Sequence, residues 1–385
     1  MPKDYRILLN ISHAGSFDRE LHQGIAMYSK MHGPWVFYHQ PPDYLGRTQN
    51  ESILDLAQRL KPDGIIMSES PEIQSIIELN IPVIVSPLTR LFNGVTNIIA
   101  NDTAIGKMAA NYFIEKGYTN LAFLGNDTIF WSKLRAKAYS DECLLQNKKF
   151  YKNPDWNENA SWEETINFIS TWLQALPKPL ALFACADDFG CQAVEACKVM
   201  GIKVPQEVAV LGVDNDESLC ELSQPAMSSI YQHSALVGFE AARVLHLLMN
   251  GHASFIGNII NNQNVIITRQ STDVFAVKDE QITKAIMYIN THAPKANITV
   301  NNVVKATHLS RRSLETRFNK LLHRSILDEI KRVRIANIDN LLINSNHTIS
   351  EIADQTGFIN LNSLSGYFKA VKNMSPIDFR RFYKL

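Results

Sequence analysis

The sequence predicts a large α/β domain with parallel sheets, followed by a smaller domain that contains only helices. Short aliphatic runs alternate with segments of helical period as far as about residue 232, which is typical of strand and helix units in a parallel sheet. Beyond about residue 280 the strand-like runs stop. The charge divides at the same place: residues 278–385 carry 17 Lys and Arg against 9 Asp and Glu, a net of +8, and the formal net charge of the chain is zero. The preceding residues therefore hold a net of −8.

Seven runs rich in Ile, Val, Leu and Ala are predicted to be buried strands, at residues 6–11, 64–68, 82–86, 97–101, 121–125, 180–185 and 208–213, and residues 227–231 are interpreted as one more strand. Helical segments such as 18–33 and 103–117 lie between them. Four glycines stand where such helices should end: Gly33, Gly117, Gly201 and Gly251. The pattern runs for about 270 residues, which is long for one sheet, so we expect two similar lobes. The predicted domains are residues 1–276 and 277–385.

Composition excludes several classes of protein. The first residues lack the pattern of a secretory signal and no apolar run is long enough to span a membrane, so we expect a cytoplasmic protein with no membrane partner. Five cysteines without a C-x-x-C pair indicate free thiols. No G-x-G-x-x-G, G-x-S-x-G or H-E-x-x-H motif occurs, and we expect neither an enzyme nor a bound cofactor or metal. A carbohydrate-processing enzyme remains the alternative, because several carboxylates could converge in a cleft.

Two segments of the basic domain repeat one another. Residues 303–318 align with 352–368 if one residue is inserted, pairing Thr307 with Thr356, Leu309 with Phe358, Leu314 with Leu364 and Phe318 with Phe368. Each segment has the pattern of a helix, a tight turn and a second helix. In the first copy, Ser310 is the expected N-cap of the second helix. In the second copy, the expected N-cap of that helix is Asn360 or Asn362. The predicted buried stripes are Leu314, Phe318 and Leu321 in one copy, and Leu364, Phe368 and Val371 in the other.

The exposed faces of the second helices are candidates for contact with operator double-stranded DNA. The candidate residues are Arg311, Arg312, Glu315, Thr316, Arg317, Leu361, Asn362, Ser363 and Lys369. Arginine can pair with guanine and asparagine with adenine, whereas lysine neutralises phosphates. Residues 326–344 are predicted to form one long helix that fixes the separation of the two second helices. A separation of about 34 Å would let them reach successive major grooves of DNA. The alternative is a helical oligomerisation module with a solvated basic face.

The stretches "ISEIADQTGF" and "LSGYFKAVKNMSPIDFRRF" resemble the DNA-binding domain of AraC-type transcription activators, and the resemblance covers about residues 281–383. It implies two helix-turn-helix units. Gly366 departs from the family pattern, because many members carry a basic residue there, so the second helix is expected to contact fewer bases.

The first domain resembles the periplasmic-binding-protein-like sensor of LacI-type regulators. Stretches such as "FDRELHQGIAMYS" and "ALFACADDFGCQAVEACKVMGIKVPQEVAVLGVDND" carry the likeness. Ligand residues in such a fold lie at the carboxyl ends of strands. The candidates are Phe17, Asp18, Arg19, Asp102, Trp131, Arg135, Asp188, Asp214 and Gln232.

By resemblance, the expected polar contacts to sugar hydroxyls are Arg135, Asp188 and Asp214, with Trp131 or Phe17 stacked on the ring. Alternative roles stay open. Asp102 and Asp188 could be N-caps, Asp214 could form a turn, and Trp131 could belong to the core.

The joint arrangement resembles bacterial regulators that respond to a small sugar. It implies D-xylose as the effector, activation of xylose-utilisation genes, a homodimer, and RNA polymerase as a candidate partner. A regulator of the same architecture for another monosaccharide is the alternative.

Overall fold

The computed structural model describes residues 4–39, 52–155, 160–252, 257–274, 279–322, 324–345 and 347–383. The chain divides into two compact units: the first comprises Met1–Asn111 and Asn120–Asp273, and the second Tyr112–Thr119 and Val274–Leu385. The predicted domain boundary between residues 276 and 277 lies outside the described residues. None of the described helices is both long and apolar enough to cross a bilayer.

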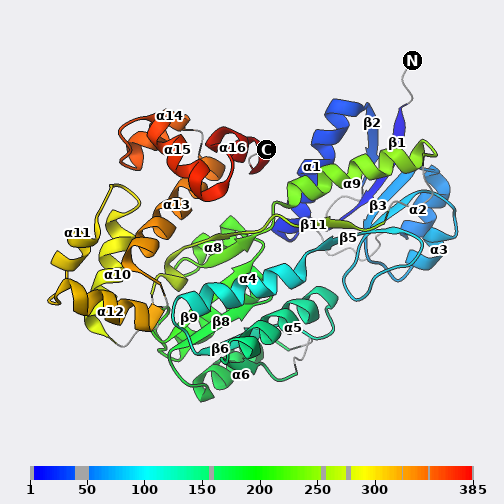
Figure 1. Ribbon diagram of the computed structural model, residues 1–385. Coiled ribbons are helices and arrows are strands. Elements are labelled where there is room, and N and C mark those ends of the chain that lie inside the picture. The colour runs from blue at the N-terminus through cyan, green and yellow to red at the C-terminus, as the bar shows by residue number, and fades with distance from the viewer. Residues whose placement is uncertain are drawn as a thin grey trace. The chain divides into compact units, whose positions relative to one another are not determined.

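The first unit contains two six-stranded sheets (Figure 1). The first sheet has the order β11-β5-β4-β3-β1-β2, and its paired strands are parallel. Its strands are β1 (Tyr5–Asn10), β2 (Trp35–Tyr38), β3 (Gly64–Ser68), β4 (Val83–Ser86), β5 (Thr96–Ala100) and β11 (Ile259–Asn261). This confirms the parallel α/β class. The sequence did not predict β2 or β11.

The second sheet has the order β12-β10-β9-β8-β6-β7, and only its edge strand β12 runs antiparallel, in its pairing with β10, among the described ladders. Its strands are β6 (Asn120–Leu124), β7 (Lys149–Lys152), β8 (Leu180–Ala184), β9 (Val208–Val213), β10 (Ser228–Tyr231) and β12 (Val265–Ile267). The three central strands β8, β9 and β6 are almost wholly buried, as their apolar runs predict.

The helices of the first unit follow the strands along the chain, and the last residues of α4, from Tyr112 onward, are assigned to the second unit. They are α1 (Ser16–His32), α2 (Ile53–Leu60), α3 (Ile73–Ile77), α4 (Asp102–Glu115), α5 (Phe130–Leu145), α6 (Trp162–Ala175), α7 (Asp187–Val199), α8 (Glu217–Leu222) and α9 (Ser234–Met249). Gly117, Gly201 and Gly251 have the left-handed φ expected at helix ends, whereas Gly33 has a φ of −84° and ends α1 in extended backbone. All five cysteines are free, and four are buried.

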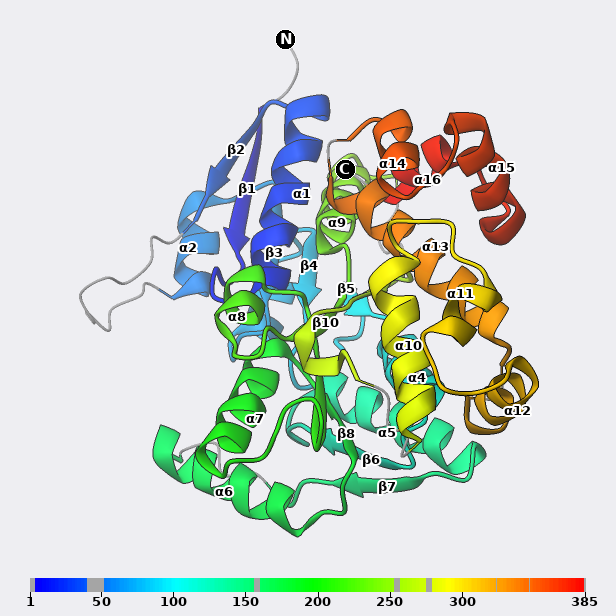
Figure 2. The ribbon, with the colours of Figure 1, turned by 90° about the vertical axis from the view of Figure 1, so that its left-hand side faces the viewer.

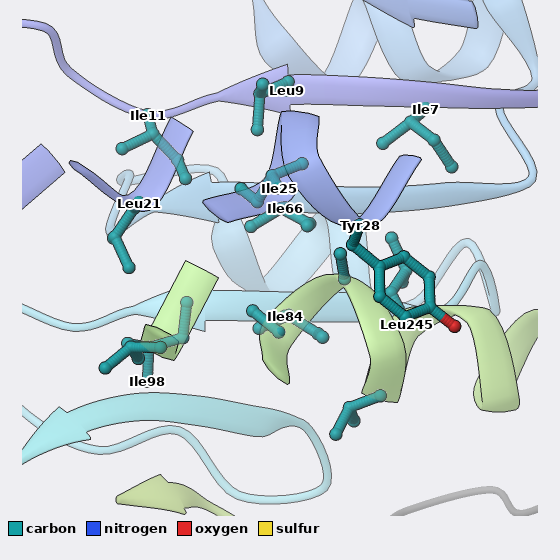
Figure 3. Close-up of a cluster of buried hydrophobic side chains, with 14 of the residues drawn as sticks. Ile7, Leu9, Ile11, Leu21, Ile25, Tyr28, Ile66, Ile84, Ile98 and Leu245 are labelled. Atoms are coloured by element: carbon teal, nitrogen blue, oxygen red, sulfur yellow. The ribbon is translucent and has the colours of Figure 1, made fainter. Parts of the chain in front are cut away.

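Helices α1 and α9 pack closely although they are distant in the sequence (Figure 1). Glycines permit the approach: a Cβ on Gly24 would meet the carbonyl oxygen of Ala235, and one on Gly238 would meet that of Leu21. The pair covers one face of the first sheet. Figure 3 shows Leu21, Ile25 and Tyr28 of α1 and Leu245 of α9 beside the strand residues Ile7, Leu9, Ile66, Ile84 and Ile98, and all of them belong to one buried cluster.

The chain leaves the second sheet through a 3-10 helix, Gln270–Thr272, that is fixed to β9 and β10. The buried Ser271 hydroxyl donates to the carbonyl oxygen of Val210 at 2.6 Å and accepts from the amide of Ser228 at 2.8 Å. The hydroxyls of Ser228 and Thr272 lie 2.7 Å apart. We call these contacts the exit anchor.

The second unit is helical apart from its connections in the described residues. Its helices are α10 (Glu280–His292), α11 (Val300–Lys305), α12 (Arg311–Leu322), α13 (Ile326–Asn344), α14 (Ile349–Gln355), α15 (Leu361–Lys372) and α16 (Pro376–Tyr383). Figure 2 shows α13 running between a group formed by α10 to α12 and a group formed by α14 to α16. Each group encloses its own buried cluster, and α13 contributes to both. This arrangement confirms the all-α class of the second domain.

Candidate functional site

A pocket of about 330 Å³ in the first unit is lined by residues at the carboxyl ends of strands from both sheets. Ligands bind at this edge in open α/β sheets. The lining consists of Ser12, Gly15, Phe17, Asp18, Ser68, Glu69, Ser86, Pro87, Leu88, Ile98, Ile99, Ala100, Asp102, Phe130, Trp131, Arg135, Asp214 and Gln232. Seven of the nine sequence candidates are among them: Phe17, Asp18, Asp102, Trp131, Arg135, Asp214 and Gln232.

A buried ion pair stands at one wall of the pocket. Nε of Arg135, on α5, donates to Oδ1 of Asp102, on the first turn of α4, at 2.8 Å. The guanidinium also donates to the carbonyl oxygen of Cys185 at 2.6 Å and lies 4.6 Å from the centre of the Trp131 ring. Burial raises the pKa of Asp102, although Arg135 acts in the opposite direction. These contacts fix a charged donor and a flat aromatic side chain side by side in the lining.

Asp214 and Gln232 line the pocket at the ends of β9 and β10. The amide nitrogen of Gln232 donates to the Asp214 carboxylate at 2.5 Å. Asp214 has a φ of +102°, and its backbone is held by bonds to Ile230 and Ser16. Strained backbone of this kind clusters at binding sites. Burial raises the pKa of the Asp214 carboxyl, with Arg135 opposing the rise.

Helix α1 supplies an aromatic ring and another carboxyl group, Phe17 and Asp18. The pKa of Asp18 is raised to about 6, first by burial and then by the neighbouring charge of Asp214. The pocket thus combines several acceptor oxygens, one guanidinium and three aromatic side chains. Such a set can bind hydroxyl groups that donate and accept at once and can cover an apolar ring face.

The sequence prediction missed three serines and a glutamate that end or follow β1, β3 and β4, namely Ser12, Ser68, Glu69 and Ser86. Glu69 is fixed by the amides of Leu88 and Thr89, both at 2.7 Å. These three strands were predicted, so the strand-end rule could have indicated all four residues.

Two sequence candidates, Arg19 and Asp188, do not line this pocket. The guanidinium of Arg19 pairs with Asp216 at 2.5 Å and donates to the carbonyl oxygens of Ala14 and His13. Asp188 is exposed on the first turn of α7, while its neighbour Asp187 is buried and accepts from Ser229 at 2.6 Å. The alternative that Asp102 is an N-cap is wrong, because Asn101 caps α4 by accepting from the amide of Ala104 at 3.0 Å. The alternative N-cap role of Asp188 is wrong as well, since the N-cap of α7 is Ala186.

The second unit contains the two predicted helix-turn-helix units, α11 with α12 and α14 with α15. Leu314, Phe318, Leu364 and Phe368 are fully buried at equivalent positions. The prediction that Leu321 and Val371 are buried is wrong, because Leu321 is 37% and Val371 44% exposed. Leu322, four residues after Phe318, takes the buried place in α12.

The DNA candidates lie on the two second helices, and all nine are exposed. They are Arg311, Arg312, Glu315, Thr316, Arg317, Leu361, Asn362, Ser363 and Lys369. Arg311 pairs with Glu315 at 2.9 Å, and Arg317 is directed to Asp279 at 3.2 Å. Asn360, not Asn362, caps α15 by accepting from the amide of Ser363 at 2.9 Å. The side chain of Asn362 is therefore not used as a cap.

Arg334 of α13 joins the two helix-turn-helix units. Its guanidinium donates to Asn297, before α11, at 2.9 Å, and to the carbonyl oxygen of Thr356, in the second turn, at 3.0 Å. It lies 3.9 Å from the centre of the Phe358 ring. Nearby, Gly357 has a φ of +70°, and a Cβ there would meet Ala296 at 2.9 Å. One buried side chain therefore joins the segment before the first helix-turn-helix unit to the turn of the second.

Comparison with known proteins agrees with this architecture. Residues 110–272 match a periplasmic binding protein-like domain and residues 303–381 a helix-turn-helix domain. The chain is 26% identical to the xylose operon regulatory protein of Escherichia coli K12, covering 98% of this chain and 97% of that protein, and 27% identical to that of Haemophilus influenzae, covering 98% of each.

Solved structures show the same fold. One described as the xylose-binding transcription activator xylR is similar over 100% of this chain and 99% of its own, with a TM-score of 0.60 and 24% identity. A periplasmic binding protein/LacI transcriptional regulator from Alkaliphilus metalliredigens in complex with D-xylulofuranose matches 70% of this chain and 99% of its own, with a TM-score of 0.58 and 21% identity. The chain therefore combines a match to a periplasmic binding protein-like domain with a match to a helix-turn-helix domain, and it is similar to the xylose operon regulatory proteins over nearly its whole length.

Proposed function

We propose that this chain is a sugar-responsive regulator that binds D-xylose in its pocket and activates xylose-utilisation genes through its helix-turn-helix units. The observation that carries the proposal is the pocket itself. It combines Arg135, Asp102 and Asp214 with Trp131 on a chain that also holds two exposed candidate recognition helices. The xylose operon regulatory proteins, related over nearly the whole chain, support D-xylose as the effector.

In the proposed complex, carboxylate oxygens of Asp18 and Asp214 accept from sugar hydroxyls, and Arg135 donates to them. Trp131 or Phe17 covers the apolar face of the ring. A site built to pair each hydroxyl rejects an analogue that leaves its buried polar groups unpaired, so selectivity among sugars comes from these positions.

The proposed regulator binds operator DNA as a homodimer, with RNA polymerase as the partner of the activated complex. The basic charge of residues 278–385 favours binding to phosphates. Sugar can control DNA binding only if it binds more tightly to one of two conformations. A typical coupling of about 1 to 3 kcal/mol would change DNA affinity about 5- to 150-fold.

The test is a gel-shift titration of the full-length protein on a promoter fragment at fixed salt, with D-xylose and a panel of other pentoses and hexoses. We expect D-xylose to change the apparent Kd and the others to change it less. If a different sugar has the largest effect, the pocket is a sensor for that sugar. No sugar-dependent change would contradict the sensor role, and no preference over random DNA would contradict the regulator role.

A second measurement separates the regulator from a carbohydrate-processing enzyme. D-xylose incubated with the protein and followed by NMR is expected to be recovered unchanged. A time-dependent product whose formation needs the protein would contradict this part of the proposal.

A further inference from the structure

The two candidate recognition helices present different chemistry on the same backbone frame. Because Leu314 and Phe318 are buried as Leu364 and Phe368 are, positions fifty residues apart are equivalent in α12 and α15. The equivalent pairs are Arg311 with Leu361, Arg312 with Asn362, Glu315 with Ser365, and Thr316 with Gly366, and all of these residues except the half-buried Ser365 are exposed. At three of the four positions the first helix is charged where the second is apolar or neutral.

The first helix carries two exposed arginines at its N-terminal end. Glu315 and Asn301 hold the guanidinium of Arg311 from two sides, at 2.9 and 3.4 Å. Arg312 is exposed beside it. An arginine at this place in a major groove suits the two acceptor atoms of guanine, O6 and N7.

The second helix begins between two exposed aliphatic side chains. Ile359 is 92% exposed and Leu361 38%, and they flank the cap residue Asn360. Ile359 is also the residue that the second copy has in addition to the first. Asn360 is occupied by its bond to Ser363, so the side chains at this helix end that can face bases are aliphatic ones and the amide of Asn362. Thymine alone among the bases offers a methyl group in the major groove, and asparagine pairs with adenine.

Gly366 adds space on the same face, one turn beyond Asn362. A Cβ placed there would meet nothing within 4 Å, so no packing inside the protein requires a glycine. Glycine inside a helix costs about 1 kcal/mol relative to alanine. Its bare backbone allows the face that carries Asn362 to approach a base-pair edge more closely than Thr316 allows in α12.

We propose that the two units recognise different kinds of base pair: α12 contacts guanine through Arg312, and α15 contacts thymine methyl groups through Leu361 and Ile359 with Asn362 on adenine. Each binding site would then join a G·C segment to an A·T segment. Arg334, which joins Asn297 before the first unit to the turn of the second, would hold the two segments in a fixed order. This inference rests on the proposed DNA-binding function.

The experiment begins with selection of duplexes from a random pool by the full-length protein at fixed salt. The enriched duplex is then resynthesised with single chemical changes. Uracil in place of thymine removes only the methyl group, and 7-deazaguanine in place of guanine removes only the N7 acceptor. We expect uracil to weaken binding about three- to fivefold per contacted methyl in one segment, and 7-deazaguanine to weaken it about 5- to 150-fold in the other.

Variants assign each effect to a helix. The Leu361→Ala, Ile359→Ala double variant should bind thymine and uracil duplexes equally while staying sensitive to 7-deazaguanine. Arg312→Ala should show the reverse pattern, so each variant is the control for the other. All three side chains are exposed, and unchanged thermal unfolding would show that the fold is kept.

Two results would overturn the inference. One is an enriched duplex on which uracil has no effect at any position, and the other is a uracil effect that persists in the double variant. Both leave the proposed DNA-binding function standing. A pool that yields no enriched sequence would overturn that function and this inference with it.

Discussion

At the scale of single residues, the pocket depends on carboxyl groups that burial has brought close to one another. Asp214 faces Asp18 and Arg135, and its backbone adopts a φ that few side chains tolerate. Asparagine tolerates such a conformation about as well as aspartate does. The charge can therefore be removed without a large change in shape.

The Asp214→Asn variant should bind D-xylose more weakly, by about 10- to 100-fold, because a charged acceptor of hydroxyl hydrogen bonds is lost. Isothermal titration calorimetry measures the Kd. Lys137→Ala removes an exposed residue of the surface pair with Asp141 and is the matched control. If the asparagine variant binds D-xylose as well as the unchanged protein does, Asp214 has no direct contact with the sugar.

The raised pKa of Glu20 predicts that the stability of the fold depends on pH. Its carboxylate accepts from the amide of Ser234 at 3.0 Å, yet burial raises its pKa from 4.5 to about 7. A carboxyl whose pKa is raised on folding stabilises the fold while it is protonated. That contribution is complete below about pH 4.5 and is lost as the pH rises through about 7.

Thermal unfolding of the Glu20→Gln variant between pH 4.5 and 8 checks this. We expect its melting temperature to fall less steeply with rising pH than that of the unchanged protein. Parallel pH profiles for the two proteins would show that Glu20 does not titrate in this range.

Among single residues, the sequence predicted Asp214, Gln232 and Trp131 because each follows an apolar strand. Arg19 and Asp188 follow strands as well, but a strand end does not fix the direction of a side chain. Arg19 instead pairs with Asp216. Which of two neighbouring acids faces inward depends on the packing of α7, and this the sequence does not reveal.

At the scale of elements, the contact between α1 and α9 sets the shape of the first lobe. The Gly24→Ala variant would place a methyl group against the carbonyl oxygen of Ala235 and force the two helices apart. We expect a loss of about 1 to 3 kcal/mol in the free energy of unfolding. Denaturant unfolding measures it.

Gly366→Ala is the matched control for that change, since its Cβ would meet nothing within 4 Å. It should raise stability by about 1 kcal/mol, because alanine is the better helix former. Equal effects of the two substitutions would contradict the close packing of α1 against α9.

Arg334 is the positioning residue between the helix-turn-helix units. We expect Arg334→Ala to bind operators in which one or two base pairs are inserted between the two segments almost as well as the original operator, because α14 is no longer tied to the loop before α11. Gel shifts on such a spacing series measure how much affinity is lost when base pairs are inserted. Arg312→Ala is the control, because it keeps the contacts of Arg334 with Asn297 and Thr356. A spacing preference as strict as that of the unchanged protein would contradict the positioning role.

The elements that the sequence did not predict share a physical cause. Strands β2, β7, β11 and β12 have three or four residues each, and all lie at the edges of their sheets. Edge strands are partly solvated, so their residues do not form the continuous apolar runs that indicate buried strands. In β7 two lysines, Lys149 and Lys152, are exposed. Pairing with the neighbouring strand, rather than local sequence, makes these segments strands.

At the scale of the whole molecule, the net charge of zero is the sum of an acidic and a basic region, and the basic region contains the helix-turn-helix units. Affinity for DNA should therefore fall steeply with salt. We expect Lys369→Ala to weaken binding to all sequences alike and to reduce the slope of log K against log salt by about 1. Gel shifts at several salt concentrations measure the slope, and a sequence-dependent loss would indicate a base contact instead.

The exit anchor has a mechanical consequence. Ser271 and Thr272 are bonded to Val210 within β9 and to Ser228 at the start of β10, while Asp214 and Gln232 directly follow the carboxyl ends of the same two strands. Strands transmit displacement along their length because their ladders resist stretching. If a sugar bound in the pocket displaced Asp214 and Gln232, as the proposed function requires, β9 and β10 would carry that displacement to the segment where the polypeptide leaves the second sheet.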